Sequence, residues 1–172
     1  NALSPLSGTI PVLAEQAIGG LSPHTTYHFR ATANNASGST EGSDATFTTA
    51  WDWPSWAANA GCSGPTDDSN HNSIPDLIDY ATGSRPAPVV TVDGDTMKFG
   101  FNRSLIADGV TIIPQFSDDL ITWHDGPAYS ISGSAGSNAH ATELSRALVA
   151  NDLELVTLSA SAHFARLKVQ LN

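Results

Sequence analysis

The chain has 172 residues, with seven Lys and Arg against seventeen Asp and Glu, and a formal net charge of −10 at pH 7. This length accommodates one large domain or two small ones, and the acidic balance argues against nucleic acid and anionic membranes as partners. The sequence holds no run of about 18 apolar residues, so we expect no membrane insertion. Cys62 is the only cysteine, which excludes an intrachain disulfide and a thiolate metal site.

The composition points to a location outside the cell. Charged residues make up only 14% of the chain, and Ser, Thr, Ala, Gly and Asn are expected to supply most of its surface. This is typical of bacterial secreted and adhesive proteins, so we expect an extracellular or cell-surface protein. The sequence begins at Asn1 without Met or a signal peptide, which suggests a mature form or a fragment of a longer chain.

Residues 1–50 are expected to form strands. Tyr27 and Phe29 are followed by further small apolar residues that alternate with polar ones, the period-two pattern of a half-buried strand. A short strand is expected at Ala45–Thr49, after a turn rich in Gly and Ser. Ile10–Ile18 is a further candidate strand.

Part of this region carries a family resemblance. Leu21-Ser-Pro-His-Thr-Thr-Tyr27 has the form of a tyrosine corner, in which the phenol bonds back to the backbone a few residues upstream. With His28-Phe-Arg-Ala-Thr-Ala-Asn-Asn35 behind it, the stretch resembles the last strands of a fibronectin type III domain. Such a sandwich needs about 90–100 residues, and only about 50 precede Trp51. The uncovered aromatic side chains and strand edges would therefore need another structure to cover them.

Residues 51–85 are expected to form two short helices around a polar loop. The first helix is expected near Pro54–Ala60, and the second at Pro75–Thr82, where Gly83 ends it. We expect a small satellite core between them, formed by Trp53, Trp56, Leu77, Ile78 and Tyr80. Stacking of the tryptophans on sugar is the alternative.

The loop between these helices has the spacing of a calcium loop. Ca²⁺ takes roughly six to eight oxygen ligands, and a twelve-residue loop supplies them from side chains at positions 1, 3, 5, 9 and 12 and from the carbonyl at position 7. Counted from the first aspartate, the expected ligands are Asp68, Asn70, Asn72, the Ile74 carbonyl, Asp76 and Asp79. The sequence therefore predicts one bound Ca²⁺.

Two features of the loop indicate weak binding. Ser73 stands where Gly normally supplies the sharp turn, and Asn70 and Asn72 bring amides instead of carboxylates. We expect a dissociation constant of about 10⁻⁵–10⁻³ M, adequate where calcium is plentiful outside a cell. His71 occupies a non-ligand position and should face solvent. The alternative is an ordinary polar loop whose Asp and Asn residues form turns and cap the second helix.

Residues 86–172 are expected to form an antiparallel β-sandwich. Short apolar runs, such as Met97–Phe101 with its strict alternation, are separated by Asp-Gly and Asp-Asp turns. The expected strands are Val89–Val92, Met97–Phe101, Val110–Phe116, Ile121–His124, Tyr129–Ser132, Ala141–Leu144, Leu153–Leu158 and Phe164–Leu171. The predicted fold class is mainly β: antiparallel sandwich segments joined by a short helix–calcium loop–helix unit.

Three motifs in residues 51–172 carry a second resemblance: Ile74-Pro-Asp-Leu-Ile-Asp-Tyr-Ala81, Val110-Thr-Ile-Ile-Pro-Gln-Phe-Ser-Asp-Asp-Leu-Ile-Thr-Trp123 and Phe164-Ala-Arg-Leu-Lys-Val169. With the Trp-containing helix before them, they resemble the C-terminal region of many large secreted proteins of Verrucomicrobia and their relatives. The loop itself is similar to thrombospondin type 3 and dockerin calcium loops. The resemblance implies a non-catalytic region.

No enzymatic activity is expected. The sequence lacks a Gly-x-Ser-x-Gly elbow, a His-Glu-x-x-His pair, a phosphate loop and a Gly-x-Gly-x-x-Gly turn. Cys62 lies in Ala-Gly-Cys-Ser-Gly, which offers no activating group, and Asp118-Asp119 is interpreted as a hairpin turn. His124, His140 and His163 are scattered over separate predicted strands.

Two classes of function remain. The first is a structural subunit of an extracellular filament or array, a homo-polymer in which neighbouring copies complete each other's N-terminal strands by strand pairing. The second is a carbohydrate- or surface-binding module of a larger secreted protein. A polymer of identical chains supports the first, and a monomer with affinity for sugar supports the second.

Overall fold

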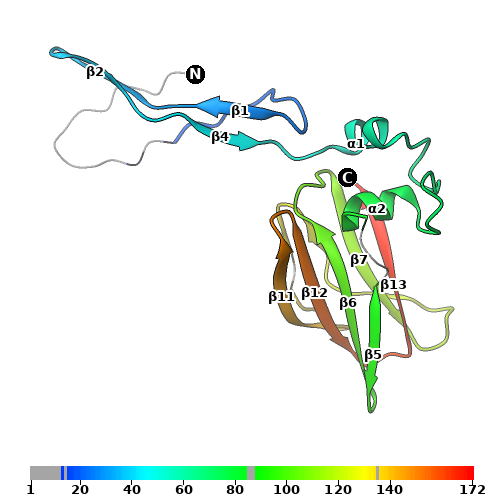
Figure 1. Ribbon diagram of the computed structural model, residues 1–172. Helices are drawn as coiled ribbons and strands as arrows, with labels where there is room; N and C mark the ends of the chain where they lie inside the picture. The colour runs from blue at the N-terminus through cyan, green and yellow to red at the C-terminus, as the bar shows by residue number, and fades with distance from the viewer. Residues whose placement is uncertain (1–12, 14, 85–87, 135) are drawn as a thin grey trace. The chain divides into compact units, whose positions relative to one another are not determined.

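The computed structural model describes residues 13, 15–84, 88–134 and 136–172, and shows a mainly β protein with several antiparallel sheets (Figure 1). This confirms the predicted fold class. The chain divides into two compact units, Asn1–Thr49 and Ala50–Asn172. The helical segment predicted at 51–85 belongs to the second unit, because its helix pair packs on the sandwich instead of standing as a separate linker.

The described part of the first unit is a long β-ribbon. Its four strands are β1 (Thr26–Phe29), β2 (Thr32–Asn35), β3 (Gly38–Glu41) and β4 (Ala45–Thr48). β1 pairs with β4 and β2 pairs with β3, both antiparallel, and the amide of Gly42 donates to the Ala31 carbonyl between the two pairs. Ion pairs join the two sides of the ribbon, at 2.7 Å between Arg30 and Glu41.

The predicted tyrosine corner is present. The phenol oxygen of Tyr27 accepts a hydrogen bond from the Ser22 amide at 2.8 Å, and the Thr49 hydroxyl donates to the Ser22 carbonyl at 2.7 Å. The candidate strand Ile10–Ile18 lies largely outside the described residues. Its described positions, Leu13 and 15–18, are not in a strand.

In the second unit, α1 (Trp53–Ala60) and α2 (Asp76–Thr82) match the predicted helices to within one residue at their starts. The Asp52 carboxylate caps α1 by accepting from the Ser55 amide at 2.9 Å, and interactions with the Ser55 side chain and then its amide lower the pKa of Asp52. Each helix ends at a glycine in the left-handed region, Gly61 and Gly83, whose amide donates to a carbonyl of the last turn.

Two antiparallel sheets form the sandwich. The first has the order β11–β12–β6–β5, and the second the order β10–β9–β7–β13, with β8 also paired to β7. The strands are β5 (Val89–Asp93), β6 (Thr96–Ser104), β7 (Val110–Ser117), β8 (His124–Asp125), β9 (Tyr129–Ser130), β10 (Gly133–Ser134), β11 (Thr142–Ala150), β12 (Leu153–Ala160) and β13 (Phe164–Leu171). Figure 1 shows the two sheets face to face.

Aromatic side chains fill the space between the sheets. Phe99 meets Phe116 edge to face at 5.9 Å, and Phe101 meets Tyr129 in the same manner at 5.5 Å. The alternation in the Met97–Phe101 sequence thus places every second side chain inside. Tyr80 of α2 joins this core, and the tryptophans of α1 pack against it. The predicted satellite core is therefore continuous with the main core.

Three predicted strands are wrong in their extent. Tyr129–Ser132 is a two-residue strand, β9, followed by the turn that leads to β10. Ile121–His124 is mostly a turn, because the Asp119 carboxylate accepts from the amides of Ile121 and Thr122 and so competes with a strand ladder. These amides lower the pKa of Asp119 to about 2. Ala141–Leu144 is the start of the longer β11, whose two bulges interrupt the alternation that reveals a strand in a sequence.

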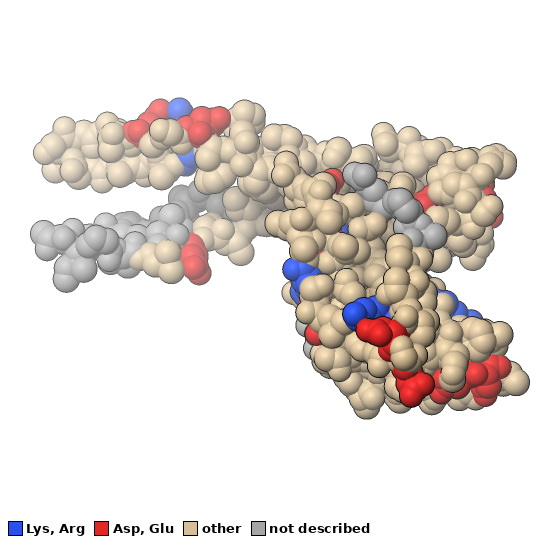
Figure 2. Space-filling model, turned by 60° about the horizontal axis from the view of Figure 1, so that its bottom comes forward, with Lys and Arg blue, Asp and Glu red and all other residues tan. Residues whose placement is uncertain are grey.

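The surface is largely uncharged. On the face shown in Figure 2, Lys, Arg, Asp and Glu form small separate groups on a background of other residues. A buried ion pair lies within the first sheet, where Arg103 Nε of β6 donates to Glu154 Oε2 of β12 at 2.6 Å. Arg103 Nη1 also donates to the Ser130 carbonyl. The bond from Arg103 Nη1 to the Ser130 carbonyl ties the first sheet to β9 of the second.

The two helix-ending glycines provide a matched stability test. Gly83→Ala should destabilise the protein more than Gly61→Ala. Both substitutions force Ala into the left-handed region, which costs about 1–2 kcal/mol, but a Cβ at Gly83 would lie 2.9 Å from Leu153 Cδ1, whereas Gly61 faces open space. We expect an additional cost of about 1 kcal/mol at Gly83, measurable by urea unfolding. Equal losses would contradict this packing.

Candidate calcium site

The predicted calcium loop folds back on itself between α1 and α2. The Asp68 carboxylate accepts hydrogen bonds from two backbone amides, Asn72 at 2.9 Å and Ser73 at 2.8 Å. The Asn72 side-chain oxygen accepts from the Ile74 amide at 2.8 Å. These bonds close the turn locally and bring its polar side chains toward the start of α2.

The backbone of the turn has the conformation that a calcium loop requires. Ser73 has φ 68° and His71 has φ 58°, both in the left-handed region. Glycine normally occupies the position of Ser73 because it reaches this region without steric cost. Ser73 therefore adopts the glycine conformation, and His71 is exposed as the sequence predicts.

Asp79 is the centre of the cluster. Its carboxylate is fully buried, and Oδ2 accepts from the side-chain amides of Asn70 at 2.7 Å and Asn72 at 2.9 Å. Its other oxygen, Oδ1, is buried without a hydrogen-bond partner. Together with the Asp68–Asn72 bond, these contacts join four of the predicted ligand side chains in one network.

The electrostatics of this cluster favour a cation. Within the described part of the chain, Asp76 and Asp79 form no ion pair with Lys, Arg or His. A buried carboxylate without a positive partner is costly, and the partial positive charge at the start of α2 offsets only part of this cost. The orphaned Asp79 Oδ1 is thus a buried acceptor that a metal ion would satisfy.

Two carboxylates, two amide oxygens and a main-chain carbonyl are hard ligands of the kind that Ca²⁺ selects. A 180° turn of each Asn amide exchanges its nitrogen and oxygen. The 2.7–2.9 Å separations at Asp79 Oδ2 suit neighbouring ligands on a shell with metal–oxygen distances of about 2.4 Å. The described residues contain no group of three or more His, Cys, Asp or Glu placed for a metal, so a cation here would depend on the amides and the main chain.

Asp76 is the predicted ligand that the structure sets apart. It is buried, but its two oxygens accept from Ser69, at 3.0 Å from the amide and 2.6 Å from the hydroxyl. The bond from the Ser69 hydroxyl lowers the pKa of Asp76. Position 9 of a calcium loop often acts through water, and this placement suits such an outer role better than direct coordination.

Cys62 lies beside this carboxylate. Burial and the neighbouring Asp76 carboxylate raise the pKa of the Cys62 thiol. The sequence offered no signal for this contact, because fourteen positions separate the two residues.

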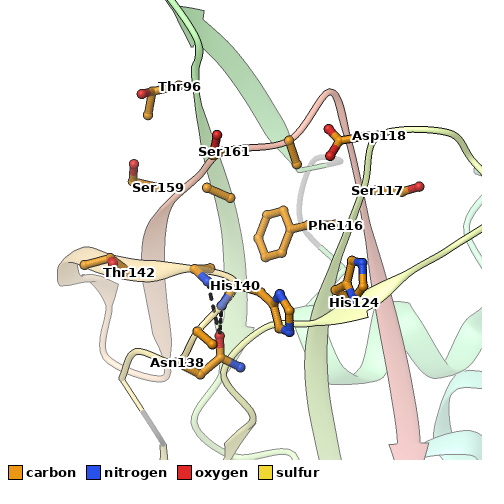
Figure 3. A pocket seen from close by; sticks show the side chains of 14 residues that line it. Thr96, Phe116, Ser117, Asp118, His124, Asn138, His140, Thr142, Ser159 and Ser161 are labelled. Carbon is orange, nitrogen blue, oxygen red and sulfur yellow. Dashed lines mark hydrogen bonds between the residues drawn. The ribbon is translucent and has the colours of Figure 1, made fainter.

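A second polar cluster lies at one end of the sandwich (Figure 3). The rings of His124 and His140 stack with centroids 4.6 Å apart. The sequence predicts only that these histidines lie on separate segments. The Asn138 side chain orders the loop beneath by accepting from the amides of His140 and Ala141. The two histidines come from segments that only the folded sandwich brings together, so the sequence gives no spacing signal for them.

A cavity of about 350 Å³ opens at these rings. Hydroxyl groups line much of its wall, from Thr96, Ser117, Thr142, Ser159 and Ser161. Asp118 lies at its edge and bonds the ring of His163 at 2.8 Å. The lining offers several hydrogen-bond donors and acceptors around a small polar space.

No family model, curated protein or solved structure matches this chain. No helix in the described residues is both long enough and apolar enough to cross a bilayer.

Asp79 allows a sharp test of the calcium site. In calcium, Asp79→Asn should lower the melting temperature by about 3–8 °C, the shift expected for about 1–3 kcal/mol of lost ion binding in a chain of this size. In EDTA, the variant should melt at or above the wild-type temperature, because it no longer buries an uncompensated charge. Differential scanning calorimetry in both buffers gives the comparison.

Asp67→Asn is the matched control, since Asp67 is an exposed carboxylate of the same loop. It should retain the full calcium response. A wild-type melting temperature that EDTA leaves unchanged would show that the loop binds no calcium.

Proposed function

We propose that the protein is a non-catalytic structural subunit that assembles outside the cell into a filament or surface array. Identical copies associate by β-strand pairing through their N-terminal strands, and Ca²⁺ stiffens each copy. The observation that carries this proposal is the first unit: none of its described residues is buried.

The ribbon of this unit presents an uncovered aromatic strip. Tyr27 stacks on Phe47 with ring centroids 5.7 Å apart, and Phe29 lies 6.1 Å from Phe47. Phe29 nevertheless remains 51% exposed and Phe47 38% exposed. Contiguous exposed apolar groups of this kind mark interaction surfaces.

Strand pairing is the interaction that this ribbon lacks. A two-stranded ribbon is marginally stable in water, and further strands or a packed layer are needed to stabilise it. In the described residues, β1 and β4 pair only with each other, so each has one free edge of backbone donors and acceptors. Free edges are templates for strands of another chain.

Identical copies are the partners that best explain a filament. When a ribbon of one copy is covered by a different surface of the next, the contact is heterologous, and such contacts propagate unless a ring closes. Calcium would reinforce each copy by holding the loop between α1 and α2 against the sandwich.

A carbohydrate-binding module is the second candidate, and the polar cavity at His124 and His140 favours it (Figure 3). Its hydroxyl and imidazole groups suit hydrogen bonds to sugar hydroxyls. If this function holds, NMR titration with oligosaccharides should show binding at about millimolar concentration that His140→Ala removes. A panel of sugars without spectral changes would contradict it.

The assembly proposal predicts that the aromatic strip is required for polymerisation. Negative-stain electron microscopy and light scattering should show filaments or large assemblies for the wild type in calcium. Phe29→Ser with Phe47→Ser should abolish them, because the pair loses about 25 cal/mol for each Å² of apolar surface that assembly buries. The sandwich should keep its melting temperature.

Ile121→Ser is the control, since Ile121 is 85% exposed on a turn of the second unit. It should assemble as the wild type does. Wild-type protein that stays monomeric at high concentration in calcium would overturn the proposed function.

A further inference from the structure

We propose that the groove between β5 and β13 receives residues 9–18 of a neighbouring copy as an added strand, and that calcium strengthens this docking because the calcium loop forms one wall of the groove. The inference rests on the proposed assembly of identical copies, for which it names the acceptor surface and the donor segment. The neighbouring copy is the occupant to which the proposal commits.

The sandwich is open along one side. In the described residues, β5 pairs only with β6 and β13 pairs only with β7, so each sheet ends in a free edge. Figure 1 shows both free strands on the same side of the sandwich. A cavity of about 360 Å³ confirms that they border one space, because its lining includes Val90 of β5 and Leu167 of β13.

The floor of this groove is the hydrophobic core. Phe99 and Phe101 of β6 lie at its base and are only 1% and 2% exposed. Ile78 of α2 and Ala165 of β13 complete its apolar wall. An entering side chain would therefore extend the core.

The register of β5 shows that part of the core face is uncovered. Val90 is paired with Phe99, and Val92 with Met97, so each pair directs its side chains to the same face of the sheet. Phe99 and Met97 are 1% exposed, yet Val90 is 45% and Val92 is 69% exposed. Val90 and Val92 of β5 thus face the core side of the first sheet but are not covered by the second sheet. One added strand would cover them.

The chain itself contains a segment of suitable pattern. Thr9-Ile-Pro-Val-Leu-Ala-Glu-Gln-Ala-Ile18 places Ile10, Val12, Ala14 and Ile18 on one face of an extended strand. The described positions of this segment are not in a strand, and the side chains of Leu13 and Ile18 are 81% and 52% exposed. The two large apolar side chains of this segment that the structure describes are therefore available for burial against a partner.

The length of residues 9–18 and the position of Pro11 are compatible with pairing at one free edge of the sandwich. The ten residues 9–18 span about 33 Å when extended, and the eight-residue strand β13 spans about 27 Å. Pro11 lacks an amide proton, which a strand tolerates where its amide side faces away from the pairing edge. The segment would pair with the free edge of β13 or β5 and insert its apolar face toward Phe99.

The calcium loop is part of the groove wall. Ser73, Ile74 and Pro75 line the cavity. The amide of Ser73 donates to Asp68 and that of Ile74 donates to Asn72, two predicted calcium ligands. An ion that orders these ligands also orders the wall, and by linkage the bound strand must then strengthen calcium binding by the same factor.

The test uses a fluorescent peptide of residues 8–20 and the full chain carrying Ile10→Asp and Val12→Asp, which disables its own donor segment. Fluorescence anisotropy in 1 mM calcium, a concentration within the range of about 10⁻⁴–10⁻³ M typical of extracellular calcium modules, should show saturable binding. Adding Val90→Asp to the protein should weaken binding at least tenfold. Val149→Asp, at a 52% exposed position on the opposite edge strand β11, is the matched control and should leave binding unchanged.

Two further measurements complete the test: peptide binding after calcium removal, and filament formation by the chain with the disabled donor segment. EDTA or Asp79→Asn should weaken peptide binding severalfold, and unchanged binding would overturn the coupling. Equal binding to the Val90→Asp and Val149→Asp proteins would overturn the groove. Filaments that persist in the Ile10→Asp, Val12→Asp chain would overturn the donor segment while leaving the proposed function standing.

A peptide that binds the disabled chain but not the wild type at any dilution would indicate that the segment docks within its own chain. That result would overturn the neighbouring copy as occupant. Sedimentation of the wild type in the same buffers distinguishes this outcome from a failure of assembly.

Discussion

A buried carboxylate must be balanced by hydrogen bonds or by positive charge, and the region between α1 and Gly83 is organised around this requirement at Asp79. The side-chain amides of Asn70 and Asn72 converge on one oxygen, and the other oxygen is left without a partner. Because α2 carries both Asp79 and the core residue Tyr80, the balance of this charge is tied to how the helix sits on the sandwich. A cation would satisfy the loop and the helix at once.

Each unit also leaves apolar surface uncovered, for different structural reasons. The ribbon has too few strands to enclose Phe29 and Phe47, whereas the sandwich has a complete core but a first sheet that extends beyond the second at β5. Neither surface resembles scattered single exposed side chains, which are ordinary in soluble proteins. Both lie beside free strand edges, so backbone pairing and apolar burial would be gained in the same contact.

Much of the fold follows from local patterns in the sequence. Met97–Phe101 and Phe164–Leu171 alternate clearly, and both lie in strands. α1 is bounded by an aspartate cap and a glycine stop, signals that operate within one turn of helix. Tyr27 was identifiable because its hydrogen bond spans only five residues.

What the sequence could not supply depends on contacts between distant segments. The bulges of β11 disturb the period-two pattern, and the stacking of His124 on His140 arises only once the second sheet and the loop before β11 are in place. Asp68, Asn70, Asn72 and Asp79 lie in one hydrogen-bonded cluster, and their role as calcium ligands stays a prediction from the spacing of the loop. The spacing of the loop could not show that Ser69 and Cys62 interact with Asp76. Spacing predicts which residues can be ligands, but not which other groups interact with the same carboxylate oxygens.

The strength of the site decides which role calcium can have. For a dissociation constant of about 10⁻⁴ M, about 1 mM calcium stabilises the folded state by about 1.4 kcal/mol, and for about 10⁻⁵ M by about 2.7 kcal/mol. The two sheets of the sandwich are already joined by the contact of Phe99 with Phe116 and by the hydrogen bond from Arg103 to the Ser130 carbonyl. An increment of this size is instead enough to shift a local equilibrium, such as the ordering of Ser73 and Ile74 at the groove. In the proposed assembly, a weak ion site at the groove wall would therefore adjust the contacts between copies more than the folding of each copy.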